Sequence, residues 1–202
     1  MKPITKTLAI GVLAIATSAP IHASIGDVPA GEYKLEETHG YITFTYSHLG
    51  FSNPVVGFTR FNVTLDLDQN DVQNSALSVS IDPASIESNV EKFNDHLKSD
   101  DFFDVANYPD LSFTATSIAM SGDNSLTIVG DLTAKGITKP VTLDATINKA
   151  ATNPISRTPT IGVSASGTLK RSDWDLGLYA PNVGDEVTLN IQVELIPADP
   201  EA

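Results

Sequence analysis

The chain has no cysteine and few basic residues, and these two shortages exclude several classes of protein. Without cysteine it has no disulfide bonds, so its core alone must hold the fold together. Its 202 residues include 12 Lys and Arg against 25 Asp and Glu, which gives a net charge of −13. Nucleic acids and anionic lipid headgroups are bound by clustered basic residues. We therefore expect neither as a partner, and we expect the acids to keep the protein soluble.

Long apolar runs are also missing, which excludes a transmembrane helix. One short run, from Leu8 to Ala16, follows Lys2 and Lys6 and ends before Pro20, which is the layout of a secretory signal peptide. Ala23 is a small residue suited to the position before a cleavage site. We expect residues 1–23 to be a signal peptide, cleaved near Ala23, and residues 24–202 to form a single domain in the periplasm or outside the cell. No Cys follows the run, so a lipoprotein anchor is excluded.

Motifs for catalysis and metal binding are equally scarce. The chain contains no GxSxG, P-loop or Rossmann fingerprint. His39, His48 and His96 are scattered, without the spacing or the cysteines of a metal site, so we expect no metal. The carboxylate pairs at 66/68, 100/101 and 173/175 are explained by solvated faces or helix caps. We therefore predict no cofactor and no catalytic residues.

What the sequence has in abundance is alternation of apolar and polar residues, which indicates strands with one apolar face. Eight runs show it, separated by turn sequences such as SGDNS at 121 and KGITKP at 135. The apolar positions of these runs are Ile42/Phe44/Tyr46, Phe61/Val63/Leu65/Leu67, Leu77/Val79/Ile81, Leu111/Phe113, Leu126/Ile128, Val141/Leu143/Ala145/Ile147, Ile161/Val163 and Val187/Leu189/Ile191/Val193/Leu195.

The predicted fold class is all-β, an antiparallel barrel of about eight strands, because closure removes the exposed edges of a meander. A two-sheet sandwich stays open as an alternative. An outer-membrane barrel would also alternate, with its apolar residues facing lipid. Aromatic residues are scarce, at 7%, and many of them gather in one segment instead of two girdles, which argues against that alternative.

That segment is a short helical insertion at about 83–105. Asp82 can cap a first turn that begins at Pro83, Asn89 can cap a helix, and Ser99 can start a second one. Phe102 and Phe103 add to an apolar face that would cover one end of the barrel. The cover either only seals the core or gates an apolar cavity.

Three further residues have a structural and a functional interpretation. His48 continues the inward face of Phe44 and Tyr46, as a hydrogen-bonded rim residue or as a contact for the head of a ligand. The other two lie in the run LKRSDWDLGLY. In the structural interpretation, Arg171 forms an ion pair with a neighbouring Asp and Trp174 packs at one end of the barrel. In the functional interpretation, the two residues frame the mouth of a pocket.

Several blocks of the chain together resemble the YceI-like family of bacterial secreted, polyisoprenoid-binding, lipocalin-like proteins. The blocks are THGYITFTYSHLGFS, VSIDPASIES, HLKSDDFFDVANYPDLSFTATSI, VGDLTAKGITKPVTL and GTLKRSDWDLG, in the right order and at the right separations. The resemblance implies a lipocalin-like barrel with a long hydrophobic cavity that holds an isoprenoid chain, such as that of a quinone. Family members are typically periplasmic or secreted and are commonly dimers, so a homodimer is open here too.

The resulting hypothesis is a periplasmic binding or carrier protein for an isoprenoid or another long-chain lipid. Its alternatives are an enzyme that acts on the bound isoprenoid or quinone, and a structural or sequestering barrel without a specific ligand. The predicted cavity lining is Phe44, Tyr46, Phe61, Val63, Phe102, Phe103 and Phe113. The predicted mouth is His48, Arg171 and Trp174.

Overall fold

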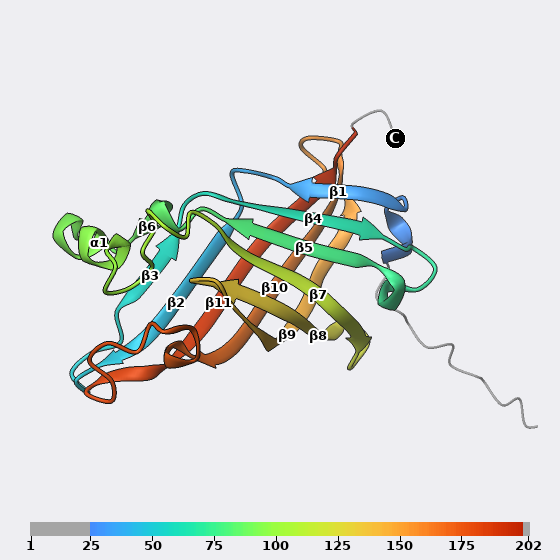
Figure 1. Cartoon of the computed structure of the whole chain (residues 1–202). Helices are drawn as coiled ribbons and strands as arrows, with labels where there is room; N and C mark the ends of the chain where they lie inside the picture. The colour runs from blue at the N-terminus through green and yellow to red at the C-terminus, as the bar shows by residue number, and fades with distance from the viewer. Residues whose placement is uncertain (1–24, 200–202) are drawn as a thin grey trace, which may run out of the picture.

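The computed structural model describes residues 25–199 and consists mainly of strands (Figure 1). The expected signal peptide lies outside the described residues. One α-helix, α1 (Glu91–Lys98), and four 3-10 helices accompany the strands: η1 (Ile25–Asp27), η2 (Val72–Asn74), η3 (Pro83–Ser85) and η4 (Arg171–Trp174). The strands are β1 (Gly31–Leu35), β2 (Tyr41–His48), β3 (Val55–Phe58), β4 (Phe61–Leu67), β5 (Ala76–Ile81), β6 (Ile86–Glu87), β7 (Leu111–Met120), β8 (Ser125–Ala134), β9 (Ile137–Thr152), β10 (Pro159–Lys170) and β11 (Val183–Pro197).

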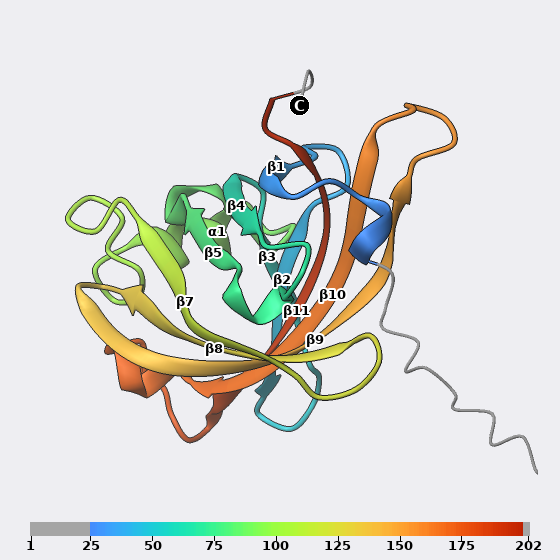
Figure 2. The ribbon, with the colours of Figure 1, turned by 90° about the vertical axis from the view of Figure 1, so that its right-hand side faces the viewer.

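Eight of the strands close into an antiparallel barrel, in the order β1-β4-β5-β7-β8-β9-β10-β11, and β11 returns to β1. Figure 2 looks at the barrel from the end that carries η1 and η2. The apolar positions of the alternating runs face inward, as in β4, where Val63, Leu65 and Leu67 are buried and Asn62, Thr64 and Asp66 are exposed. The predicted all-β barrel of eight strands with a short helical insertion is thereby confirmed.

One side of the barrel wall extends beyond the closed eight-strand part. On that side, three long strands are each interrupted by a break and continue after it as a second, separately numbered strand. β11 pairs with β1 near its end and with β2 along its earlier part, so β1 and β2 are two halves of one long strand. The same holds for β4 with β3 and for β5 with β6. The breaks at 36–40, 59–60 and 82–85 lie at the same level of neighbouring strands. Beyond them, β2, β3 and β6 form an extension at the left of Figure 1.

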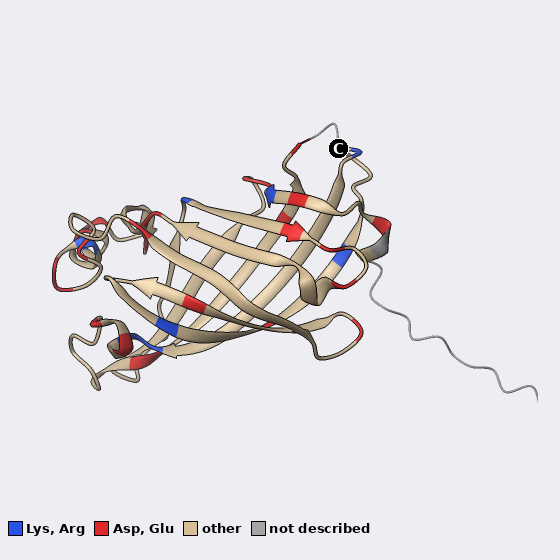
Figure 3. Ribbon diagram, turned by 45° about the vertical axis from the view of Figure 1, so that its right-hand side comes forward, with Lys and Arg blue, Asp and Glu red and all other residues tan. Residues whose placement is uncertain are grey.

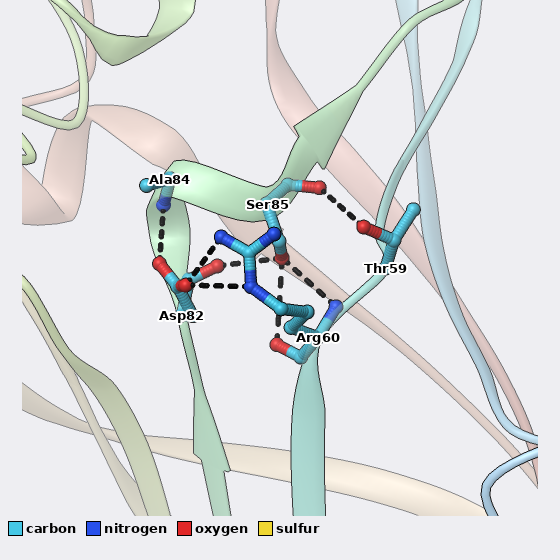
Figure 4. A network of polar contacts seen from close by, with 5 residues as sticks. All are labelled: Thr59, Arg60, Asp82, Ala84 and Ser85. Atoms are coloured by element: carbon cyan, nitrogen blue, oxygen red, sulfur yellow. Dashed lines mark hydrogen bonds and ion pairs between the residues drawn. The ribbon is translucent and has the colours of Figure 1, made fainter.

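A compact polar network holds two of these breaks together (Figure 4). Asp82 caps η3 by accepting from the Ala84 amide at 2.8 Å, as its sequence position predicts. Its other carboxylate oxygen accepts from Nε and Nη2 of Arg60 at 2.9 and 2.6 Å. Ser85, 5% exposed, donates to the Asp82 carbonyl and accepts from the Arg60 amide. The network replaces the ladder hydrogen bonds that the breaks remove.

We expect this network to make stability depend on pH below about 4, the ordinary pKa of an aspartate. The Arg60 guanidinium holds the pKa of Asp82 below its ordinary value, with the Ala84 amide adding to that effect and partial burial opposing it. Because the folded pKa is the lower one, the stabilisation is present above the unfolded pKa and disappears as the pH falls through the folded one. The Asp82 side chain is 39% exposed, so screening limits the contribution to about 1 kcal/mol or less.

Urea unfolding of Asp82→Asn between pH 7 and pH 3 tests this expectation, because Asn keeps the capping oxygen and removes the charge. The variant should be less stable than wild type at pH 7, and the difference should close below pH 4. Asp123→Asn, in the exposed β7–β8 turn, is the matched control and should show no such trend. A difference for Asp82→Asn that is constant over the whole range would contradict the assignment.

The helical insertion differs from its prediction in two respects. α1 begins after Val90, not after an Asn89 cap; Asn89 is left-handed (φ 63°) and Val90 is 55% exposed. The second helix is absent, since residues 99–107 form turns, and the Ser99 hydroxyl donates back to the His96 carbonyl at 2.7 Å. Asn94, buried in α1, accepts from the Ser88 amide and hydroxyl and so fixes the entry to the helix instead.

Candidate ligand-binding cavity

The interior of the barrel contains a cavity of about 400 Å³ with an almost wholly apolar wall. Side chains that face inward from β10 show that the barrel is hollow: Val163, Ala165 and Leu169 line the cavity and are only half-buried, although they lie on the inner face. In a packed barrel such positions would be covered by side chains from the opposite wall. The volume lies within the range of small-molecule binding pockets.

Two glycines on the inner face let large side chains lie flat against the wall. A Cβ atom at Gly130 on β8 would overlap the ring of Phe113 and lie 2.6 Å from the Thr114 carbonyl oxygen. A Cβ atom at Gly167 on β10 would lie 2.7 Å from Cδ2 of Leu143. Because nothing projects from these positions, the Phe113 ring and the Leu143 side chain spread along the sheet instead of into the hollow.

The insertion covers the end of the cavity that carries the β2–β3–β6 extension. Phe93, Leu97, Phe102 and Phe103 all contribute to the lining. Phe103 packs edge-on against Phe58 of β3, with ring centroids 5.7 Å apart. Phe102 contacts the rings of His96 and Tyr179 at 5.0 and 6.5 Å, so the insertion meets the η4–β11 loop across the opening.

Lys135, at the tip of the β8–β9 hairpin, ties these two covering segments together. Its ammonium donates to the Asp100 carbonyl at 3.5 Å, and to the carbonyl and carboxylate of Asp175 at 3.1 Å each. Far along the barrel, Ile25 of η1 and Val72 of η2 line the cavity as well. The hollow therefore runs along much of the barrel, which suits a long, thin ligand.

Arg171 and Trp174, on η4, are built into the wall on the side of the covered end. The Arg171 guanidinium donates to three backbone carbonyls, those of Leu176, Val183 (2.9 Å) and Gly184 (2.8 Å). The indole of Trp174 donates to the Leu132 carbonyl at 3.1 Å. The Arg–Asp bridge that the sequence suggested within this run is not formed: Asp173 pairs with Lys139 and Asp175 with Lys135.

The few polar groups of the cavity gather on this same side. Burial raises the pKa of the Tyr46 phenol, although the nearby Arg171 charge opposes the shift. The phenol therefore stays neutral and can donate a hydrogen bond. Burial lowers the pKa of Arg171, which Asp185 and Tyr46 partly offset, and three of its five N–H donors bond backbone carbonyls. The site thus offers hydrogen bonds and apolar contact instead of a free charge.

These features agree with a known family. A family model described as the YceI-like domain matches residues 33–195. The chain belongs to the YceI-like family. Protein YceI of Escherichia coli is 34% identical over 180 residues, which cover 88% of this chain and 93% of that protein.

Solved structures share the barrel. The Campylobacter jejuni YCEI protein is 30% identical and superposes with a TM-score of 0.69, over 76% of this chain and 90% of that one. A domain from Saccharophagus degradans that is described as polyisoprenoid-binding has a TM-score of 0.62 at 14% identity, over 82% of this chain and 98% of that one. At this identity the second likeness concerns the fold alone.

The structure places most of the predicted site residues at the cavity. Its wall includes Phe44, Tyr46, Val63, Phe102, Phe103 and Phe113, and also His48, Arg171 and Trp174. Phe61 is the exception: it begins β4 beside the strand break and lies near Leu35 and Gly40, outside the lining. Of the predicted mouth residues only His48 is exposed, since Arg171 and Trp174 are 8% and 3% exposed.

Sequence reasoning missed other residues of the site. Tyr179 and His96 lie at the covered end, and the contact between their rings joins segments that are far apart in the chain.

A cluster of polar side chains lies outside the cavity, at the β1–β2 break. Carboxylate oxygens of Glu36 and Glu194 and a ring nitrogen of His39, atoms of the type that bind metals, lie within 4.8 Å of one another there. The hydrogen bond to Glu36 (2.6 Å) raises the pKa of His39 and joins these two side chains at the break.

Proposed function

We propose that the protein binds a long-chain lipid, of the isoprenoid or isoprenoid-quinone class, in the barrel cavity and carries it in the periplasm. One observation carries the proposal: an apolar hollow of about 400 Å³ runs along the barrel and is covered, not filled, by the Phe-rich insertion. A barrel packed solid with its own side chains would leave no such hollow. The description of the Saccharophagus degradans domain as polyisoprenoid-binding supports the same class of ligand.

The energetics of tail burial are sufficient without any charge on the ligand. Each CH₂ group moved from water into such a cavity contributes about 0.8 kcal/mol. Ten groups therefore contribute about 8 kcal/mol, the free energy of a roughly micromolar Kd, and a longer tail contributes more to offset the costs of ordering and association. The neutral phenol of Tyr46 and the ring of His48 are then contacts for the head of the ligand.

The proposal is tested by extracting the purified protein with organic solvent and identifying co-purified lipid by mass spectrometry. We expect a prenyl or other long-chain lipid in a ratio approaching one per chain. A protein that carries no lipid, and that takes up none from detergent micelles containing a long-tailed ubiquinone, would contradict the proposal. Osmotic-shock fractionation of cells that express the full chain tests the periplasmic location separately.

A further inference from the structure

Five large apolar side chains are exposed on two neighbouring segments, and we call them the apolar rim. Three belong to the β2–β3 connection and the first residue of β3: Leu49 is 52% exposed, Phe51 88% and Val55 58%. The other two, Leu178 and Tyr179, belong to the η4–β11 loop and are 37% and 55% exposed. Both segments form tips at the lower left of Figure 1, at the end of the barrel that the extension lengthens.

The apolar rim is continuous with the covered end of the cavity. His48, the residue before Leu49, pairs with Val183 of β11, and the Tyr179 carbonyl accepts from the Val183 amide at 2.9 Å. His48, Tyr179 and Val183 all line the cavity. A tail that leaves the hollow past the Phe102–Tyr179 contact therefore emerges between the two tips.

Both segments are uncharged in a chain that is otherwise rich in acids. Residues 38–59 and 176–184 contain no Asp, Glu, Lys or Arg, although 18% of the chain is charged. Acidic residues are distributed over much of the remaining ribbon (Figure 3). Apolar side chains can enter the boundary of a bilayer only where no charge must be dehydrated with them. The two tips meet that condition.

We propose that the apolar rim docks the protein on the surface of a bilayer so that a lipid passes between membrane and cavity without crossing water. This inference rests on the lipid-binding function proposed above. The partner is a zwitterionic or weakly charged lipid surface, because a net charge of −13 disfavours anionic headgroups. Separate projecting tips suit insertion into headgroups better than they suit a flat interface with a second copy.

The experiment measures co-sedimentation of the purified protein with phosphatidylcholine vesicles, with and without phosphatidylglycerol. We expect Phe51→Ser and Leu49→Ser each to lower the vesicle partition coefficient, the former by about tenfold because it removes the most exposed aromatic ring. Ile155→Ser is the matched control, since Ile155 is 91% exposed at the other end of the barrel and should be neutral. Phosphatidylglycerol should weaken binding at low salt.

A second measurement separates docking from ligand binding. Uptake of a long-tailed ubiquinone from vesicles should slow in Phe51→Ser, whereas its equilibrium binding from detergent micelles should be unchanged. Failure of micelle binding in wild type would remove the proposed function, whereas normal micelle binding without any vesicle binding would overturn docking alone. Docking is also overturned if Ile155→Ser loses as much as Phe51→Ser, or if sedimentation shows a dimer that Phe51→Ser dissociates.

Discussion

Filling the cavity at Ala165 is expected to weaken the binding of a long-chain lipid more than a hundredfold while the barrel stays folded. Ala165 lies in the middle of β10, between Ala145 of β9 and Ile191 of β11, and its methyl group faces the hollow. A Phe at this position has open space in front of it, because Ala165 lines the cavity and is only half-buried. Its ring would occupy volume that the tail of the ligand needs.

The expected loss of affinity follows from the length of tail that the ring displaces. If about four methylene groups are excluded, roughly 3 kcal/mol is lost, which corresponds to more than a hundredfold weaker binding. The chain has a single Trp, and Trp174 lines the cavity, so quenching of its fluorescence by a long-tailed ubiquinone measures the binding directly. Because the new ring fills a void, the free energy of unfolding of Ala165→Phe should equal or exceed that of wild type.

Ser166→Phe is the matched control, since Ser166 is the next residue on β10 and its exposed side chain lies on the outer face. It should bind ubiquinone as wild type does. Unchanged affinity in Ala165→Phe, with thermal unfolding showing an intact barrel, would show that the ligand does not occupy the middle of the hollow. Loss of affinity together with unfolding would instead mean that the site was already packed.

The strands could be predicted from the sequence because each long strand has one buried and one solvated face. The runs at 61–67 and 187–195 contain enough alternations to fix which residues point inward. β1, β3 and β6 have only five, four and two residues, so they hold too few alternations to be recognised. β3 and β6 nevertheless belong, with β2, to the extension that lengthens the barrel at the covered end of the cavity.

The site was harder to predict. Alternation shows which residues of a strand point into the barrel, but it does not show which of them line the cavity. Phe61 has the same parity as Val63 but lies where the break at Gly40 lets its ring approach Leu35. The hollow also depends on side chains that are missing, at Gly130 and Gly167, and a strand pattern does not distinguish such a glycine from a bulge. The contact between Tyr179 and the insertion joins segments about 80 residues apart, beyond the reach of any local pattern.

Replacing Arg171 with Met is expected to cause a large loss of stability. The guanidinium is 8% exposed and satisfies the carbonyls of Leu176, Val183 and Gly184, which belong to the η4–β11 loop and the start of β11. Met fills a similar volume but donates nothing, so these acceptors lose charge-assisted hydrogen bonds. With about 1–3 kcal/mol for each buried acceptor and incomplete additivity, we expect a total loss of about 3 kcal/mol.

For a domain of this size, such a loss lowers the melting temperature by about 6–12 °C. Lys170→Met is the matched control, because Lys170 is the exposed neighbour of Arg171 and should change the melting temperature little. Arg171→Lys should be more stable than Arg171→Met but less stable than wild type, because a single ammonium group cannot reach the three carbonyls that the planar guanidinium contacts. Full recovery by Lys would show that the positive charge alone is required.

The same variant separates the two roles that the sequence left open for Arg171. If Arg171 only anchors the loop, micelle-delivered ubiquinone should still bind to the folded fraction of Arg171→Met with nearly wild-type affinity at low temperature. If the guanidinium contacts the head of the ligand, affinity should fall at every temperature. Its three hydrogen bonds to backbone carbonyls favour the first outcome, because they commit three of the five N–H donors of a guanidinium and hold the group against the loop.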